Sequence, residues 1–132
     1  MNIKKTANLL INFAIKRLAE VFGIVIFSAG SILFISLITY SPEDPNFIFP
    51  NNTEIKNFLG FQGSFVSDLF FQSMGLIAYL VSFTFIITGI NIFRIKDFFL
   101  FIEYTFFIIF YSLCGTIFLS QFFSVEFLLY IN

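Results

Sequence analysis

The run VFGIVIFSAGSILFISLITY, residues 21–40, holds no charged residue and leads directly into SPEDP, residues 41–45. A helix of about 20 apolar residues is long enough to cross the ~30 Å hydrocarbon core of a bilayer. The two prolines of SPEDP cannot continue a helix because each lacks a backbone N–H, and its two acids oppose sliding into lipid. The sequence therefore predicts a transmembrane helix that ends at Tyr40 and leaves the membrane through a stiff, acidic turn.

The composition also indicates a membrane protein. Hydrophobic residues make up 58% of the chain and charged residues 11%, whereas soluble domains carry about 25% charged residues. A net charge of −1 gives no reason to expect direct nucleic-acid binding. The chain has no His, and its one Cys, Cys114, lies in an apolar run. We therefore expect no metal site, no internal disulfide and a membrane-buried thiol.

Two further apolar runs reach the length of a membrane span. Residues 69–93 are free of charge, and residues 98–123 are interrupted once, by Glu103. We predict an all-α membrane protein, a helical bundle with three transmembrane helices. Its predicted parts are a cytoplasmic segment 1–20, the spans 21–40, 69–93 and 98–123, a periplasmic loop 41–68, and a periplasmic or interfacial tail 124–132.

The distribution of basic residues predicts the orientation of the chain in the membrane. Basic residues precede the first span and separate the second span from the third, whereas the loop between the first and second spans has one. In chain order they are Lys4, Lys5, Lys16, Arg17, Lys56, Arg94 and Lys96. This pattern predicts a cytoplasmic N-terminus. We expect the first span to be an uncleaved anchor, because it is longer than a signal-peptide core and no A-x-A-like site follows it.

The N-terminal segment has its own pattern. Between Ile3 and Leu18 the apolar residues recur on one helical stripe, with lysines and asparagines elsewhere. This spacing is typical of an amphipathic helix lying on the inner leaflet. The alternative is a frayed, basic tail whose only role is to set the topology.

Small residues predict where the spans pack, because helices in lipid associate through close approach. They recur on one face of the second span and on one face of the first. The candidate packing residues are Gly75, Ala78, Ser82 and Gly89 on the second span and Gly23 and Gly30 on the first. We expect packing within the chain, although packing against another copy would use the same stripes.

Glu103 is the one acid inside a predicted span, and intramembrane acids are functional candidates. It lies near the inner face, so the structural alternative is contact with headgroups or pairing with Arg94, Lys96 or Lys16. A proton or ion role would need a second charged group at the same depth, and the sequence offers none.

The motifs of nucleotide and acyl-transfer enzymes do not occur in this chain. There is no G-x-x-x-x-G-K-[ST] loop and no G-x-G-x-x-G fingerprint, and without His a nucleophile–base pair cannot be built in the usual way. We therefore predict a non-catalytic chain with no cofactor and no small-molecule substrate.

Two segments together carry a family resemblance. LITYSPEDPNF, residues 37–47, and NFLGFQGSFVSDLFFQSMGLIAYLVSFTFIITGINIFRIK, residues 57–96, resemble the N-terminal four-helix membrane region of the FtsK/SpoIIIE family of bacterial DNA translocases. The residues of the turn and motifs are Tyr40, Ser41, Pro42, Asp44, Pro45, Gly60, Gly63, Asp68, Gly75, Ala78 and Tyr79. The chain departs from the family pattern at Asn46, Ser67 and Met74, where Ser, Ala and Phe are usual.

The resemblance implies a role and partners. Family members anchor a cytoplasmic ATPase motor that pumps double-stranded DNA, and the membrane region joins the division machinery at the septum of the inner membrane. The implied partners are the lipid bilayer, other division proteins and copies of the same chain. The family's fourth span, linker and motor have no counterpart in this sequence, so we expect either a fragment of a longer protein or a stand-alone membrane component.

The approach to the second span has a local interpretation as well. Gly60 and Gly63 precede a helical pattern, and Ser64 is a candidate N-cap with Asp68 in the first turns.

Two alternatives to the anchor function stay open at this point: a small transporter or channel subunit, and a stand-alone membrane scaffold. A channel would need polar residues along a path at the bilayer midplane, where the sequence offers Ser, Thr and Tyr.

Overall fold

The structure is a computed structural model, and it describes residues 3–45 and 54–122. These residues form four α-helices and no strand: α1 Ile3–Ile38, α2 Gly60–Met74, α3 Ile77–Ile95 and α4 Phe99–Phe122. α1, α3 and α4 are long and apolar enough to cross a membrane. The predicted all-α class with three spanning helices is confirmed. The predicted tail, 124–132, lies outside the described residues.

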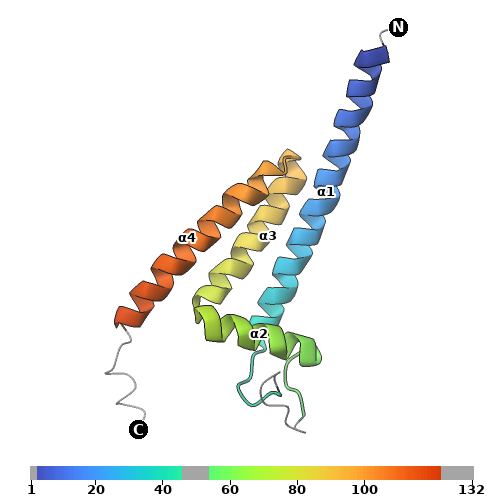
Figure 1. Cartoon of the computed structure of the whole chain (residues 1–132). Helices are drawn as coiled ribbons and strands as arrows, with labels where there is room; N and C mark the ends of the chain where they lie inside the picture. The colour runs from blue at the N-terminus through green and yellow to red at the C-terminus, as the bar shows by residue number, and fades with distance from the viewer. Residues whose placement is uncertain (1–2, 46–53, 123–132) are drawn as a thin grey trace.

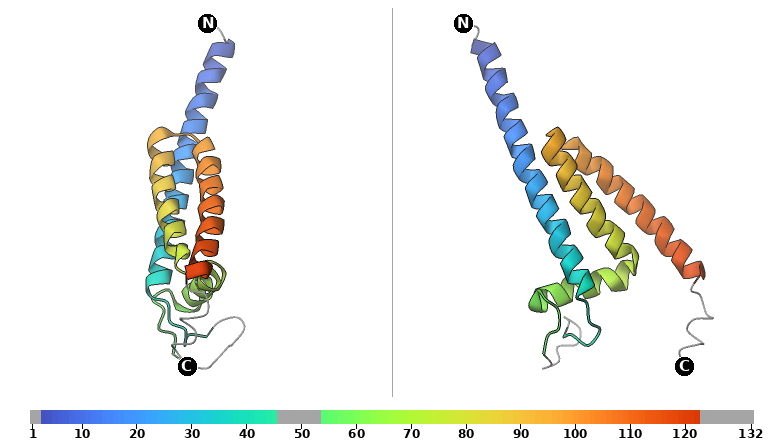
Figure 2. Two further views of the ribbon diagram at one scale, coloured as in Figure 1. Left: turned by 90° about the vertical axis from the view of Figure 1, so that its left-hand side faces the viewer. Right: turned by 180° about the vertical axis from the view of Figure 1, so that it is seen from behind.

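The helices are arranged around α3. α3 packs against both α1 and α4, and α2 runs across the ends of α1 and α3 (Figure 1). α1 extends well beyond the turn that joins α3 to α4, as the views in Figure 2 also show. The molecule therefore has two distinct ends, an N-terminal end with the α3–α4 turn and an α2 end.

α1 joins two segments that the sequence pattern separates. Residues 3–20 are helical, but no break divides them from the predicted span 21–40. The chain has no proline before Pro42, so nothing in this segment ends the backbone hydrogen-bond ladder. α1 thus has neither the frayed tail nor the bend with which a separate helix would turn onto a membrane surface.

The predicted second span, 69–93, is not one helix. α2 ends at Met74 and α3 begins at Ile77, with Gly75 between them at φ 58°. A positive φ is readily adopted by glycine and costs other residues free energy. Gly75 has open space around its Cα, so it is a turn residue and not the packing residue that its spacing indicated. Residues 69–74 belong to the crossing helix α2.

Close approach of two backbones defines the contact between α1 and α3. A Cβ added to Gly23 would lie 2.7 Å from the backbone nitrogen of Phe93 and 2.8 Å from the carbonyl oxygen of Gly89. One added to Gly30 would lie 2.8 Å from the backbone nitrogen of Ile86. The structure thus places these glycines on a shared helix–helix contact within the chain, and Ala78 and Ser82 are fully buried on α3.

α4 is held more loosely. In the most apolar 18-residue stretch of α4, 6% of the residues are buried within the chain, against 39% in that of α3. Near the α3–α4 turn the ring of Phe22 on α1 lies 5.3 Å from that of Phe101, and toward the α2 end α4 diverges from α1 (Figure 2). Two polar pairs tie α4 to α3: Thr84 with Tyr111 at 2.9 Å and Asn91 with Tyr104 at 2.8 Å.

The apolar core lies toward the α2 end. Leu33 and Leu37 of α1 pack with Ala78 and Val81 of α3 and with Ile108 of α4. Phe70, Phe71 and Met74 of α2 are partly buried and pack against this cluster. The core therefore fixes the end of α1 against the start of α3, which is where the sequence motifs meet.

Candidate functional site: the polar junction of α1 and α2

The sequence motifs converge on a network of hydrogen bonds at the α2 end. We call it the polar junction, and it comprises residues 36–45, 54–59 and the α2 residues Gly63, Ser64 and Asp68. The last carbonyl groups of α1 would lack partners at a helix end, and buried carbonyl groups need hydrogen bonds. The polar junction supplies several of those bonds.

Asp44 ties the two arms of the loop together. Its carboxylate is buried, with 5% of the residue exposed. It accepts hydrogen bonds from the backbone N–H groups of Lys56 and Asn57, each at 2.8 Å. The Asp44 N–H in turn donates to the carbonyl of Ser41, which closes the SPEDP turn. Hydrogen bonds to a carboxylate are stronger than those between neutral groups, so Asp44 locks the exit turn to the approach to α2.

Asn57 caps the end of α1 from the second arm. Its side-chain amide donates to the carbonyl groups of Ser36 at 3.0 Å and Thr39 at 3.3 Å, and its side-chain oxygen accepts from the N–H of Leu59. The residue is buried, with 4% exposed. Asn57 is not among the residues predicted from the sequence. The available signal was an asparagine three residues before Gly60, a pattern typical of turns.

Two serines attach α2 to the preceding elements. Ser36 donates from Oγ to the carbonyl of Gly63 at 2.5 Å, and Ser64 donates to the carbonyl of Pro45 at 3.2 Å. The space beside Gly63 is occupied by the side chains of Asn57 and Leu59, so a larger residue would displace the cap. Ser64 is buried and lies within α2, so it does not cap this helix.

The predicted N-cap is thus wrong, because α2 begins four residues earlier, at Gly60. The residue before it, Leu59, makes no side-chain capping bond, and no acid lies in the first turn. Gly60 has a φ of 69°, which permits the sharp change of direction at this point. Asp68 accordingly lies in the middle of α2.

Asp68 pairs with the last residue of the predicted first span. The hydroxyl of Tyr40 donates to Asp68 Oδ1 at 3.1 Å, and the amide of Gln72 donates to Oδ2 at 2.8 Å. The ring of Tyr40 lies 4.6 Å from that of Phe71. Partial burial and the neighbouring carboxylate both raise the pKa of Tyr40 above its ordinary value, because each disfavours the phenolate.

The outer rim of the polar junction carries an exposed ion pair between Lys56 and Glu43. The hydrogen bond to Glu43 raises the pKa of Lys56. Because both side chains are largely exposed, this pair contributes little to stability. The rigidity of the polar junction therefore comes from the buried Asp44 and Asn57 contacts.

The opposite, N-terminal end holds a smaller charged cluster. Glu20 pairs with Arg17 at 2.6 Å and with Lys96 at 2.7 Å, which joins α1 to the α3–α4 turn. Glu103 is exposed on α4, and the described residues give it no ion pair. Lys96, one of its predicted partners, is instead bound to Glu20. Contact of Glu103 with lipid headgroups stays a prediction.

The polar junction is a rigid, hydrogen-bonded structure. Residues 3–45 and 54–122 contain no group of His, Cys, Asp or Glu that could hold a metal. Within the same ranges every buried side-chain nitrogen or oxygen has a hydrogen-bond partner, so none is left aimed at a missing ligand. Of the motif residues, the structure brings Tyr40, Asp44, Gly63 and Asp68 into one network, and it places Gly60 and Gly75 at the two ends of α2.

These features define a multi-pass helical membrane domain whose first span is locked to a crossing helix. Residues 15–131 match the family described as the 4TM region of DNA translocase FtsK/SpoIIIE, and the chain belongs to this family. The resemblance carried by the sequence motifs is confirmed.

Individual relatives agree with this assignment. The chain is 31% identical over 67 residues to the DNA translocase FtsK of Rhizobium meliloti and 29% identical over 69 residues to that of Caulobacter vibrioides. These matches cover 51% and 52% of the chain but 8% of each relative. The chain is thus similar to a small part of much longer proteins. No solved structure matches it.

Proposed function

We propose that this chain is the membrane anchor of a DNA translocase that couples cell division to chromosome segregation. The observation that carries the proposal is the family match over residues 15–131. In this role the spans hold the domain in the inner membrane, and its partners position a motor at the division septum. The chain itself carries no nucleotide-binding loop, so ATP hydrolysis belongs to the motor part of the full-length family.

The charge distribution supports a cytoplasmic N-terminus. The ion pairs of Glu20 bring Arg17 and Lys96 together, so the basic residues of α1 and of the α3–α4 turn lie at one end of the molecule. Basic residues concentrate on the cytoplasmic side of multi-pass proteins. In the proposed orientation the polar junction therefore faces the periplasm.

The polar junction offers a surface to periplasmic division proteins. Phe58 is 79% exposed, although its backbone is fixed by a hydrogen bond from its N–H to Thr39 Oγ1. Exposed aromatic side chains are enriched at protein–protein interfaces. We propose that Phe58 contacts a division partner.

Localisation in dividing cells tests the anchor function. The full chain, fused at its N-terminus to a fluorescent protein and expressed in the organism that encodes it, is expected to concentrate at midcell. An unrelated multi-pass protein with the same tag provides the uniform reference. A distribution that matches this reference would contradict the septal role.

A pair of exposed phenylalanines tests the partner surface. Phe58→Ser is expected to lower the midcell fraction of the fusion while leaving its membrane level unchanged. Phe99→Ser is the matched control, because Phe99 is 76% exposed at the opposite end of the molecule. Equal effects of the two substitutions would exclude a specific role for Phe58.

A further inference from the structure

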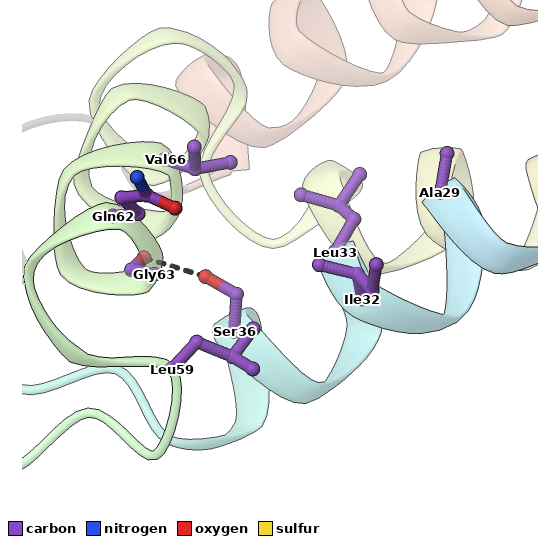
Figure 3. Close-up of a pocket in the computed structure, with 8 residues that line it drawn as sticks. All are labelled: Ala29, Ile32, Leu33, Ser36, Leu59, Gln62, Gly63 and Val66. Carbon is purple, nitrogen blue, oxygen red and sulfur yellow. Dashed lines mark hydrogen bonds between the residues drawn. The ribbon is translucent and has the colours of Figure 1, made fainter.

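A groove of about 520 Å³ lies between α1 and α2. Its walls are Ala29, Ile32 and Leu33 on α1 and Val66 on α2, and Gln62 lies on α2 at its rim (Figure 3). The groove runs along the last turns of a helix that is long and apolar enough to span the membrane. It is therefore placed to receive an apolar ligand from the bilayer.

One end of the groove is closed by a hydrogen bond between the two polar groups that lie there. Ser36 Oγ donates to the carbonyl of Gly63, as Figure 3 shows. Each of these two groups has a hydrogen-bond partner, so neither needs one from a ligand. Ala29, with its small side chain, lines the other end of the groove.

Gln62 is the polar group at this site whose amide is not engaged. Within residues 3–45 and 54–122 it makes no hydrogen bond, whereas the neighbouring Gln72 donates to Asp68. An amide can both donate and accept. Its position on the crossing helix puts it at the polar edge of an otherwise apolar groove.

The lining of the groove discriminates between occupants. Helices in lipid pack through small residues, as Gly23 and Gly30 do against α3. The walls of the groove carry the bulkier side chains of Ile32, Leu33 and Val66. The groove therefore suits a hydrocarbon chain better than a partner helix.

The charges near the α2 end discriminate between lipid headgroups. Glu43 and Glu54 are exposed there and Asp68 is half-buried, whereas Asp44 is buried in the polar junction; the one base, Lys56, is already paired with Glu43. Anionic lipids are recognised by clusters of Lys and Arg, which this end lacks in the described residues. A zwitterionic headgroup with an ammonium suits this acidic surface.

We propose that the groove binds one acyl chain of a zwitterionic phospholipid and that the Gln62 amide donates a hydrogen bond to its ester carbonyl. This inference depends on membrane insertion and not on the septal role, so either can fail without the other.

The test uses the purified full chain in vesicles that contain phosphatidylethanolamine with a diazirine on one acyl chain. After illumination, mass spectrometry is expected to find several-fold more label on Ile32, Leu33 and Val66 than on Ile109 and Ile117, which are exposed on α4. Labelling by the matched phosphatidylglycerol probe is expected to be several-fold weaker in the groove.

Two substitutions at neighbouring exposed positions give the control. Ala29→Phe fills the groove and is expected to reduce groove labelling at least five-fold, whereas Ser28→Phe, one residue earlier and outside the groove, leaves it unchanged. Gln62→Ala is expected to reduce labelling by a smaller factor. The melting temperature of each variant confirms folding.

Three results would overturn the proposal. Groove labelling no higher than on α4 would mean ordinary solvation by lipid. Labelling that survives Ala29→Phe in a folded variant would place the lipid elsewhere. Equal labelling by the phosphatidylglycerol probe would remove the headgroup preference.

Discussion

The side chain of Asn57 makes three hydrogen bonds in the polar junction, and it donates two of them to carbonyl groups of Ser36 in α1 and of Thr39 just after it. An aspartate of nearly the same size cannot donate those two bonds, and it would add a charge beside Asp44. Leaving buried polar groups without partners costs about 1–3 kcal/mol. We predict that Asn57→Asp lowers the free energy of unfolding by at least that amount, as measured by thermal unfolding in detergent micelles.

The control for Asn57 is an exposed asparagine on the same helix that it caps. Asn12→Asp makes the same chemical change on the exposed surface of α1. It is expected to alter stability by less than about 0.5 kcal/mol. If both variants melt at the temperature of the unmodified chain, Asn57 does not support the α1 end in the way that its contacts indicate.

The raised pKa of Tyr40 predicts a loss of stability in alkaline solution. Below pH ~10 the tyrosine is protonated in both the folded and the unfolded chain. Above that pH the unfolded chain loses the proton first, because burial and Asp68 disfavour the phenolate in the fold. The free energy of unfolding then falls as the pH rises through the folded pKa.

Comparison with Tyr40→Phe isolates this effect from the other groups that titrate in alkali. The unmodified chain is expected to lose more stability than the variant between about pH 9 and about pH 11. Parallel curves in a melting titration would show that the Tyr40–Asp68 contact does not survive in solution.

At the scale of the helices, the α1–α3 contact depends on residues without side chains. A methyl group on Gly89 would meet the backbone of Phe27 and of Gly23 on α1, and backbone atoms cannot rotate away. Overpacking of this kind costs about 1–3 kcal/mol. We predict that Gly89→Ala lowers the melting temperature.

Gly115→Ala is the matched substitution on α4. Its added methyl group would meet the flexible end of the Ile77 side chain, and alanine favours a helix by up to about 1 kcal/mol over glycine. We expect a change near zero. Equal destabilisation at both positions would mean that the close approach of the α1 and α3 backbones is not what makes Gly89→Ala costly.

The hydrophobic pattern predicted α1, α3 and α4 because apolar length alone identifies a spanning helix. It did not predict the break at Gly75. Residues 69–93 carry no charge, and the last turn of the crossing helix, with Phe70, Phe71 and Met74 packed on the core, continues the apolar pattern of the span. The difference lies in one backbone angle, which spacing along the sequence does not reveal.

Only part of the polar junction could be predicted from the sequence, because some of its hydrogen bonds join residues that lie far apart in the chain. Pro42 and Pro45 mark the turn by local chemistry, and Asp44 follows from the known preference of aspartate for backbone N–H groups. Asn57, however, bonds to carbonyl groups 18 and 21 residues away in the sequence. Such partners are chosen by the packing of α2 against α1, so local pattern could not identify them.

At the scale of the whole molecule, the two ends differ in kind. The N-terminal end carries basic residues on α1 and at the α3–α4 turn, and Lys96 is joined there to Glu20. The α2 end carries an acidic, hydrogen-bonded turn with a single base. A membrane protein with this asymmetry retains its basic end in the cytoplasm. We therefore expect the charge asymmetry to orient the chain with its basic end in the cytoplasm.

Labelling of single cysteines tests this orientation directly. In a Cys114→Ser background, Glu54→Cys is expected to react with a membrane-impermeant maleimide added to intact cells, because Glu54 is exposed at the α2 end. Thr6→Cys, exposed at the other end, is expected to react only after the membrane is permeabilised. The reverse pattern would place the polar junction in the cytoplasm. That result would contradict the inferred contact of Phe58 with periplasmic partners, and it would leave the helix contacts and the lipid groove intact.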